Sequence, residues 1–163
     1  MTFKAEITIG DMISIAGFVA AACGLFLAYL QMRKSNRQKR AEFIIGIYNE
    51  FASSTDMQDI YYKIEYGEFS YSNEFHKSKE EKKLDKLLGL FENISKLYEM
   101  GNITFQDMKI VAYKFVVIFK DTGVNRYLSF LESWTKQTRL SFPYSSFRRV
   151  GKVLTEKSKQ ENV

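Results

Sequence analysis

Basic and aromatic side chains alternate near the C-terminus, in a combination suited to ligand binding. Residues 136–163 carry seven cations and two anions, whereas residues 41–135 carry eleven cations and fifteen anions. Cations bind phosphates and aromatic rings stack on bases, so the pattern is typical of nucleotide or single-stranded oligonucleotide sites. The candidate residues are Arg139, Tyr144, Phe147, Arg148, Arg149 and Lys152. The same cations could instead lie against anionic lipid headgroups or keep the domain soluble.

Residues that could support catalysis are few. The only His, His76, lies in a polar stretch, and the only Cys, Cys23, lies in an apolar one, so we expect neither Ser-His-Asp nor Cys-His catalysis. No GxGxxG or GxxxxGK[ST] phosphate loop occurs. Glu80, Glu81 and Asp85 stand among lysines, which is typical of a solvated helix face. We expect a solvated His76, no enzyme activity, no cofactor and no metal.

The apolar stretch of residues 12–32 is uncharged over 21 residues. At ~1.5 Å per residue, such a helix covers the ~30 Å hydrocarbon core of a bilayer, which predicts a transmembrane helix. The alternative is a cleaved secretion signal, or a lipoprotein signal cleaved between Ala22 and Cys23. It would require a basic start and a shorter apolar run than this one.

A basic segment follows the predicted span directly. Its five cations are Arg33, Lys34, Arg37, Lys39 and Arg40. Because such residues are retained in the cytoplasm, we expect the N-terminus outside and the remaining chain inside the cell. The same cations would also contact anionic lipid headgroups.

Small residues recur within the predicted span at heptad spacing. They are Gly10, Ser14, Gly17, Ala21, Gly24 and Ala28. Small side chains let helices approach closely in lipid, so this seam predicts a homo-oligomer. A chance row in an Ala/Gly-rich segment, or packing on another protein, is the alternative.

The remaining chain predicts an all-α domain of about five helices. Apolar residues recur at helical spacing from Ala41 onward, without sustained alternation of the kind that strands show. We divide the chain into an extracytoplasmic segment (1–11), a transmembrane helix (12–32), a basic juxtamembrane segment (33–40), a cytoplasmic helical domain (41–155) and a polar tail (156–163).

Helix ends are marked by several polar and glycine residues. Thr55 or Asp56 is an expected N-cap, and Gly67 and Gly101 are expected stops. Thr104 and Asp107 resemble a capping box, which opens a helix that we expect to be buried nearly all round. Pro143 is the expected start of the last helix. Tyr48 and Trp134 are expected to face inward.

The segment LLGLFENISKLYEMGNITFQDM, with the preceding span and RAEFIIGIYNEF, resembles a group of uncharacterised bacterial single-pass membrane proteins. The architecture is also similar to small membrane effectors of anti-phage systems such as Hailong. The resemblance implies a soluble domain that senses a nucleotide or oligonucleotide and controls a membrane pore. It supplies no catalytic residue.

Two hypotheses of different classes follow. In the first, the chain is a non-enzymatic effector of the bacterial cytoplasmic membrane that oligomerises through the seam and forms a ligand-controlled pore. In the second, it is a membrane-tethered adaptor that holds a protein partner without conducting ions. An enzyme is a third, more distant alternative.

Overall fold

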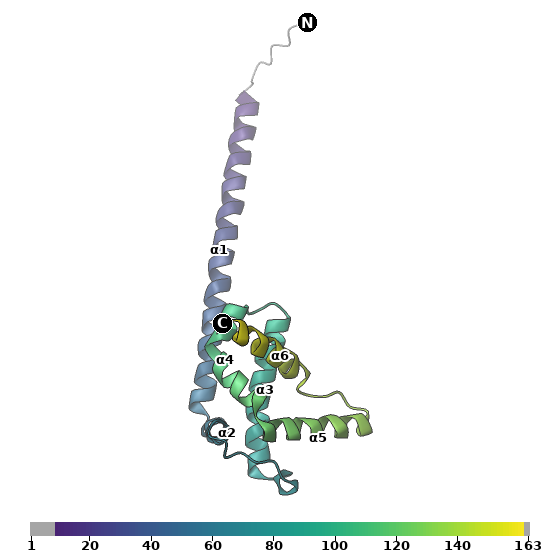
Figure 1. Cartoon of the computed structure of the whole chain (residues 1–163). Coiled ribbons are helices and arrows are strands. Elements are labelled where there is room, and N and C mark those ends of the chain that lie inside the picture. Colours follow the sequence, from purple (N-terminus) through teal and green to yellow (C-terminus); the bar gives the residue numbers. More distant parts are fainter. Residues whose placement is uncertain (1–8, 162–163) are drawn as a thin grey trace. The chain divides into compact units, whose positions relative to one another are not determined.

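The computed structural model describes residues 9–161, which form six α-helices, one 3-10 helix and no strand (Figure 1). The elements are α1 (Ile9–Ser53), α2 (Thr55–Glu65), η1 (Asn73–Phe75), α3 (Lys79–Glu99), α4 (Phe105–Lys120), α5 (Thr122–Thr138) and α6 (Ser145–Glu161). The predicted all-α class is confirmed. Parts of the predicted end segments, residues 1–8 and 162–163, lie outside the described residues.

The chain divides into two units, Met1–Glu42 and Phe43–Val163, and the division falls inside α1. In the first unit every side chain from Met12 to Met32 is exposed. By length and composition, α1 is the one helix among the described residues that could cross a membrane. The basic segment 33–40 continues the same helix.

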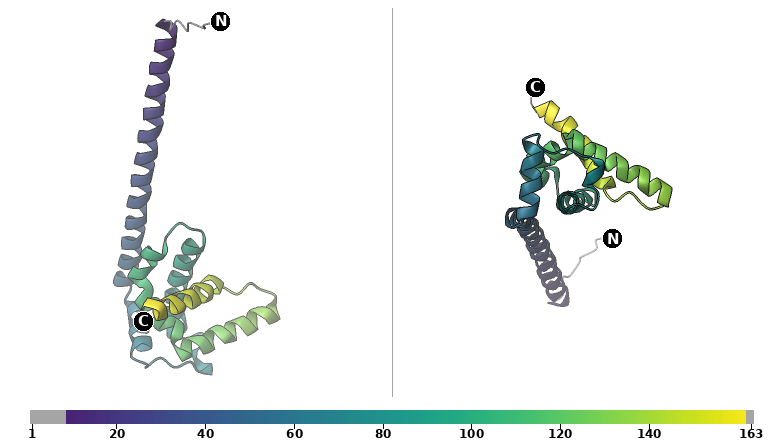
Figure 2. Two further views of the ribbon diagram at one scale, coloured as in Figure 1. Left: turned by 45° about the horizontal axis from the view of Figure 1, so that its top comes forward. Right: turned by 90° about the horizontal axis from the view of Figure 1, so that it is seen from below.

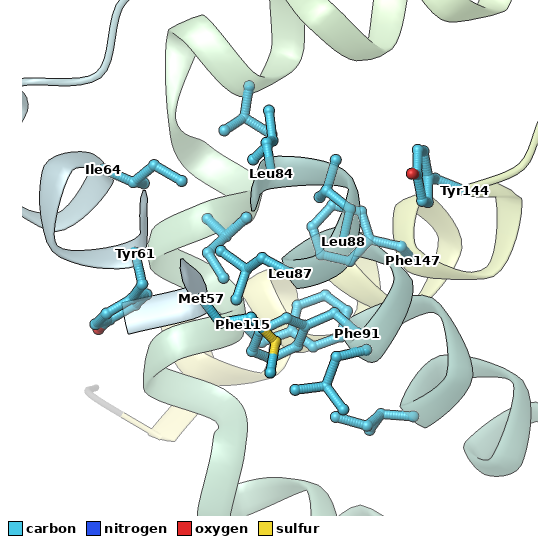
Figure 3. Packing of buried hydrophobic residues seen from close by; sticks show 14 of the residues in the cluster. Met57, Tyr61, Ile64, Leu84, Leu87, Leu88, Phe91, Phe115, Tyr144 and Phe147 are labelled. Carbon is cyan, nitrogen blue, oxygen red and sulfur yellow. The ribbon is translucent and has the colours of Figure 1, made fainter. Parts of the chain in front are cut away.

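The second unit is a helical domain with α3 at its centre. Helices α2 and α6 make most of the contacts with α3. The apolar stripe of α3 is fully buried at Leu84, Leu87 and Leu88, as its helical spacing predicted. Close to this stripe, the rings of Phe91 and Phe115 pack edge to face, with their centroids 5.3 Å apart (Figure 3).

Helices α2 and α3 end at the glycines that the sequence predicted, but the N-cap of α2 lies one or two residues before the predicted position. Gly67 and Gly101 adopt left-handed backbone angles (φ 72° and 73°) just after α2 and α3, as expected of stops. The N-cap of α2 is Ser54, whose hydroxyl accepts a hydrogen bond from the Met57 N–H at 3.4 Å. The expected caps Thr55 and Asp56 instead form the first turn.

The capping box at the start of α4 is confirmed. The Thr104 N–H donates to Asp107 Oδ2 at 2.7 Å, and the Asp107 N–H donates to Thr104 Oγ1 at 3.3 Å. The last helix, α6, starts at Ser145 and not at Pro143. Helices α5 and α6 form the two arms of a hairpin joined by residues 139–144 (Figure 2).

Three predictions of burial are wrong. Helix α4 is not buried all round, because Ile110 and Tyr113 on its open face are 63% and 67% exposed. Tyr48 on α1 and Trp134 on α5 are also exposed, although their helical spacing predicted that they face inward. Spacing identifies an apolar face, but only the neighbouring helices determine how much of that face is covered.

Candidate functional site

The predicted ligand-binding arginines of α6 are engaged with carboxylates of neighbouring helices. Arg149 donates from Nε and Nη2 to the two carboxylate oxygens of Glu99 on α3, at 2.6 and 2.8 Å. Arg148 pairs with Glu132 of α5, and its guanidinium lies 4.7 Å from the centroid of the Phe142 ring. Both arginines therefore join α6 to another helix.

The two other predicted cations lie at the surface. Arg139 is the C-cap of α5, with a left-handed φ of 57°, and is exposed. Lys152 is exposed on α6. Of the four predicted cations, Arg148 and Arg149 are thus engaged by carboxylates, and Arg139 and Lys152 have exposed side chains.

The aromatic part of the predicted site is corrected by the structure. Phe147 is fully buried and its ring stacks on Phe115, with 4.8 Å between centroids (Figure 3). Tyr144 is also buried, and its hydroxyl donates to Asp85 Oδ1 at 3.0 Å. Neither ring is available to stack on a base, because the first turn of α6 faces the core.

A buried carboxylate that sequence reasoning missed positions the start of α6. Glu92 of α3 is 4% exposed and accepts hydrogen bonds from the backbone N–H groups of Phe147 (2.8 Å) and Ser146 (3.4 Å). Negative charge is favoured at a helix N-terminus, where N–H groups lack partners within the helix. The available signal was its place within the apolar stripe of α3, where an acidic residue needs a polar partner.

His76 is not a solvated linker residue. Its Nε2 lies 2.7 Å from the Tyr71 hydroxyl, its Nδ1 lies 3.0 Å from Glu81 Oε1, and its ring packs on Phe130 with centroids 4.2 Å apart. The stretch that contains His76 also buries Phe69 and Phe75. This link therefore packs against the domain core and carries a half-buried polar network.

The acidic cluster at the start of α3 is correspondingly not a wholly solvated face. Asp85 accepts hydrogen bonds from the hydroxyls of Tyr127 (2.7 Å) and Tyr144 (3.0 Å). Burial, with Asp85 beside them, raises the pKa of both tyrosines, which keeps them as hydrogen-bond donors. Burial alone would raise the pKa of Glu81, but hydrogen bonds from the Lys77 backbone and from His76 lower it overall. Glu80, at the surface, pairs with Lys63.

The acidic residues that make these contacts form a row along α3, which we call the acidic row. Its members recur every four or seven residues and face hydroxyl, imidazole, guanidinium or backbone donors. They are Glu81, Asp85, Glu92 and Glu99. Through these contacts the row holds α5, α6 and the link that contains His76 against α3. Its role is therefore structural. Among the described residues, no three His, Cys, Asp or Glu side chains are grouped as metal ligands.

An open trough lies along α4, with one lining residue from α6. It encloses about 330 Å³ and is lined by Phe105, Lys109, Ala112, Tyr113, Val116, Val117, Lys120 and Leu154. Its floor is apolar and its charged lining residues are lysines. Sequence reasoning missed it, because the exposed face of α4 was expected to be covered.

The predicted seam lies along the exposed part of α1. The described side chains of the seam are solvent-facing, and a Cβ added at Gly17 or Gly24 would meet no atom within 4 Å. Ser14 donates from its hydroxyl to the Gly10 carbonyl at 2.9 Å, so its polar group is satisfied within the helix. The basic residues 33–40 follow on the same helix.

No family model, curated protein or solved structure matches the chain. The resemblance to bacterial single-pass proteins and to anti-phage effectors therefore stays a prediction.

Proposed function

We propose that this chain is a non-enzymatic effector of the bacterial cytoplasmic membrane, with its N-terminus outside and its helical domain in the cytoplasm. Residues 12–32 would anchor it, and the seam from Gly10 to Ala28 would bring copies together. The assembled helices would form a pore whose opening depends on a ligand of the domain.

The observation that carries this proposal is the continuity of α1. One helix of 45 residues contains both the exposed apolar segment and, in its last turns, part of the domain core. Ile44, Ile47 and Phe51 are all less than a tenth exposed. A change in the packing of the domain would thus act on the same helix that spans the membrane.

A phosphate ligand would act by competing with the carboxylates that hold α6. Arg149 binds both carboxylate oxygens of Glu99, and phosphate oxygens suit the same bidentate geometry. Arg148 binds Glu132 through a single Nη1 contact. Binding of a nucleotide or oligonucleotide would release α6 from its neighbours and so alter the core. Arg139 and Lys152 would attract the ligand first, because they are exposed.

The test is native mass spectrometry of the full-length chain in detergent, alone and with a short single-stranded oligonucleotide. We expect a discrete oligomer that retains the oligonucleotide, and loss of that retention in Arg139→Glu/Lys152→Glu. These two sites are preferred because Arg148 and Arg149 also hold the fold together. A ligand-free monomer under all conditions would contradict the proposal.

A membrane-tethered adaptor is the second candidate, and the exposed apolar residues of the domain favour it. Tyr48, Ile110 and Tyr113 are each about 60–67% exposed, as expected of a surface that binds a protein. Replacing residues 12–32 by a polyleucine span separates the candidates. An adaptor would keep its partner binding, whereas a seam-dependent effector would lose oligomerisation.

A further inference from the structure

A hollow beside the first turns of α3 is lined almost entirely by lysines, and we call it the lysine hollow. It encloses about 350 Å³ and is lined by Lys79, Lys82, Lys83 and Lys86 of α3 and by Asp56 from the first turn of α2. The four lysines follow one another at steps of three, one and three residues, so they share one face of α3. They are four of the eleven cations of residues 41–135, although this part of the chain carries fifteen anions.

The acidic residues of the same stretch of α3 are engaged with other partners. Glu80 pairs with Lys63 of α2. Glu81 contacts His76, and Asp85 accepts hydrogen bonds from two tyrosine hydroxyls. These carboxylates therefore do not neutralise the lysines that alternate with them in the sequence.

Three lysines of the hollow have no carboxylate partner within the part of the chain that the structure describes. Lys83 donates to Asp59 Oδ2 at 2.6 Å. Lys79, Lys82 and Lys86 are exposed, and no hydrogen bond or ion pair joins them to a described residue, Asp56 included. Like charges three or four residues apart destabilise a helix, and cations are also disfavoured in its first turn. An anion in the hollow would relieve both effects.

The arrangement of the charges favours a chain of linked phosphates. Lys79 and Lys86 are seven residues apart, which corresponds to ~10 Å along a helix. A single phosphate would reach only one end of this row, whereas a linear oligophosphate places charges along its whole length. Ammonium groups bind phosphate as point charges, without the planar geometry that arginine imposes. No aromatic side chain lines the hollow, so a base would find no ring to stack on there.

We propose that the lysine hollow binds the oligophosphate group of a small anion, with Lys79, Lys82 and Lys86 as its contacts. The hollow recognises the phosphate chain and not a base or sugar attached to it, so an inorganic oligophosphate and a nucleoside triphosphate are equivalent ligands. The site belongs to α2 and α3, whereas the ligand of the proposed function binds residues of α5 and α6. It depends neither on a pore nor on the membrane anchorage.

The test is isothermal titration calorimetry of the full-length chain in neutral detergent, with inorganic tripolyphosphate and without divalent cations. We expect saturable binding of tripolyphosphate, a similar affinity for ATP and a much lower affinity for orthophosphate. Absence of tripolyphosphate binding, or an equal affinity for orthophosphate, would overturn the proposal. Much tighter binding of ATP than of tripolyphosphate would overturn the assignment of the hollow to the phosphate chain.

A charge-reversal variant and a matched control locate the site. Lys82→Glu/Lys86→Glu should lower the affinity for tripolyphosphate on the order of tenfold or more, because two exposed ion pairs with the ligand are lost. Lys120→Glu/Arg126→Glu makes the same change in net charge at two exposed cations outside the hollow and should leave the affinity unchanged. Equal losses in both variants would refute the site, because they would indicate only a general attraction to positive charge.

A neutral variant guards against a loss of folding. Lys82→Gln/Lys86→Gln keeps the helix propensity of α3 and removes like charges from its face. It should weaken tripolyphosphate binding and, without ligand, raise the midpoint of thermal unfolding measured by circular dichroism. A lower midpoint would mean that these lysines stabilise the fold without a ligand, and it would overturn the proposal.

Arg139→Glu/Lys152→Glu separates this inference from the proposed function. Tripolyphosphate binding that survives in this variant, but is lost in Lys82→Glu/Lys86→Glu, belongs to the lysine hollow. The reverse pattern would refute the hollow and leave the proposed ligand site of α5 and α6 standing. Retention of oligonucleotide by the parent chain is measured separately, so either proposal can fail without the other.

Discussion

Gly151 lets α6 approach α4 at a point where no side chain fits. A Cβ at this position would lie 2.6 Å from Cγ and 2.7 Å from Cε2 of Phe119. Gly151→Ala should therefore lower the free energy of unfolding, since overpacking costs about 1–3 kcal/mol and the better helix propensity of Ala recovers only about 1 kcal/mol. Urea unfolding of the full chain in detergent, followed by circular dichroism, measures the change.

Gly89 on α3 is the matched control. A Cβ there meets no atom within 4 Å, so Gly89→Ala should stabilise the domain by up to about 1 kcal/mol. A loss of stability in Gly89→Ala, or a gain in Gly151→Ala, would contradict the close packing of Phe119 on α6.

The Glu99–Arg149 pair makes the free energy of unfolding of the domain depend on pH. Hydrogen bonds from Arg149 and Ser146 lower the pKa of Glu99 from 4.5 to about 2. A carboxyl whose pKa is lowered on folding contributes stability above its unfolded pKa, and that contribution is lost as the pH falls through the folded value. Glu99→Gln should therefore destabilise the domain at pH 7 and have little effect near pH 2.

Denaturant unfolding across this pH range tests the pair. Glu50→Gln provides the control, because Glu50 is an exposed acidic residue of α1 and takes no part in the α3–α6 ion pair. The expected result is a difference between Glu99→Gln and the parent chain that shrinks as the pH falls from about 4.5 toward 2. A difference that does not change with pH would show that the ion pair contributes nothing.

The identity of a polar residue in the sequence did not reveal its role in the structure. The lone His and the acidic residues of α3 were visible in the sequence, but their partners Tyr71, Tyr127 and Tyr144 come from three other segments. Whether a carboxylate is solvated or buried depends on those distant partners. The same holds for Phe147, whose aromatic ring was expected to stack on a ligand but packs on Phe115 in the core.

At the scale of elements, the seam of α1 makes a prediction of its own. Gly17→Ile/Gly24→Ile should shift the chain from oligomer to monomer, because β-branched side chains prevent close approach of the helices. Ala22→Ile, about 140° around the helix from Gly17, should leave the oligomer unchanged. Light scattering of the purified full-length chain in detergent gives the mass. Equal effects of both substitutions would contradict a specific seam.

Helix α3 shows what periodicity alone reveals of an element. Its apolar stripe and its boundaries were predictable, because Ser78, Gly101 and the spacing of its leucines are local signals. Its acidic row was not recognised, although the steps of four and seven residues place it on one face. Such a row is ambiguous until another helix brings donors to it, as α6 does with Arg149.

Across the whole chain, local sequence patterns predicted the all-α class, the long apolar helix with its basic flank, and several helix ends. These features depend on interactions within one turn or on composition over a few turns. They do not depend on which other segment packs against the helix.

Packing between distant segments determines which surfaces remain open and which charges are engaged. It buried Tyr144 and Phe147, paired Arg148 and Arg149 with carboxylates, and left the trough of α4 uncovered. These outcomes arise from contacts between residues far apart in the chain, such as Glu92 with Phe147. A single sequence does not encode such pairings in any local pattern, because each partner satisfies its own helical periodicity equally well without the other.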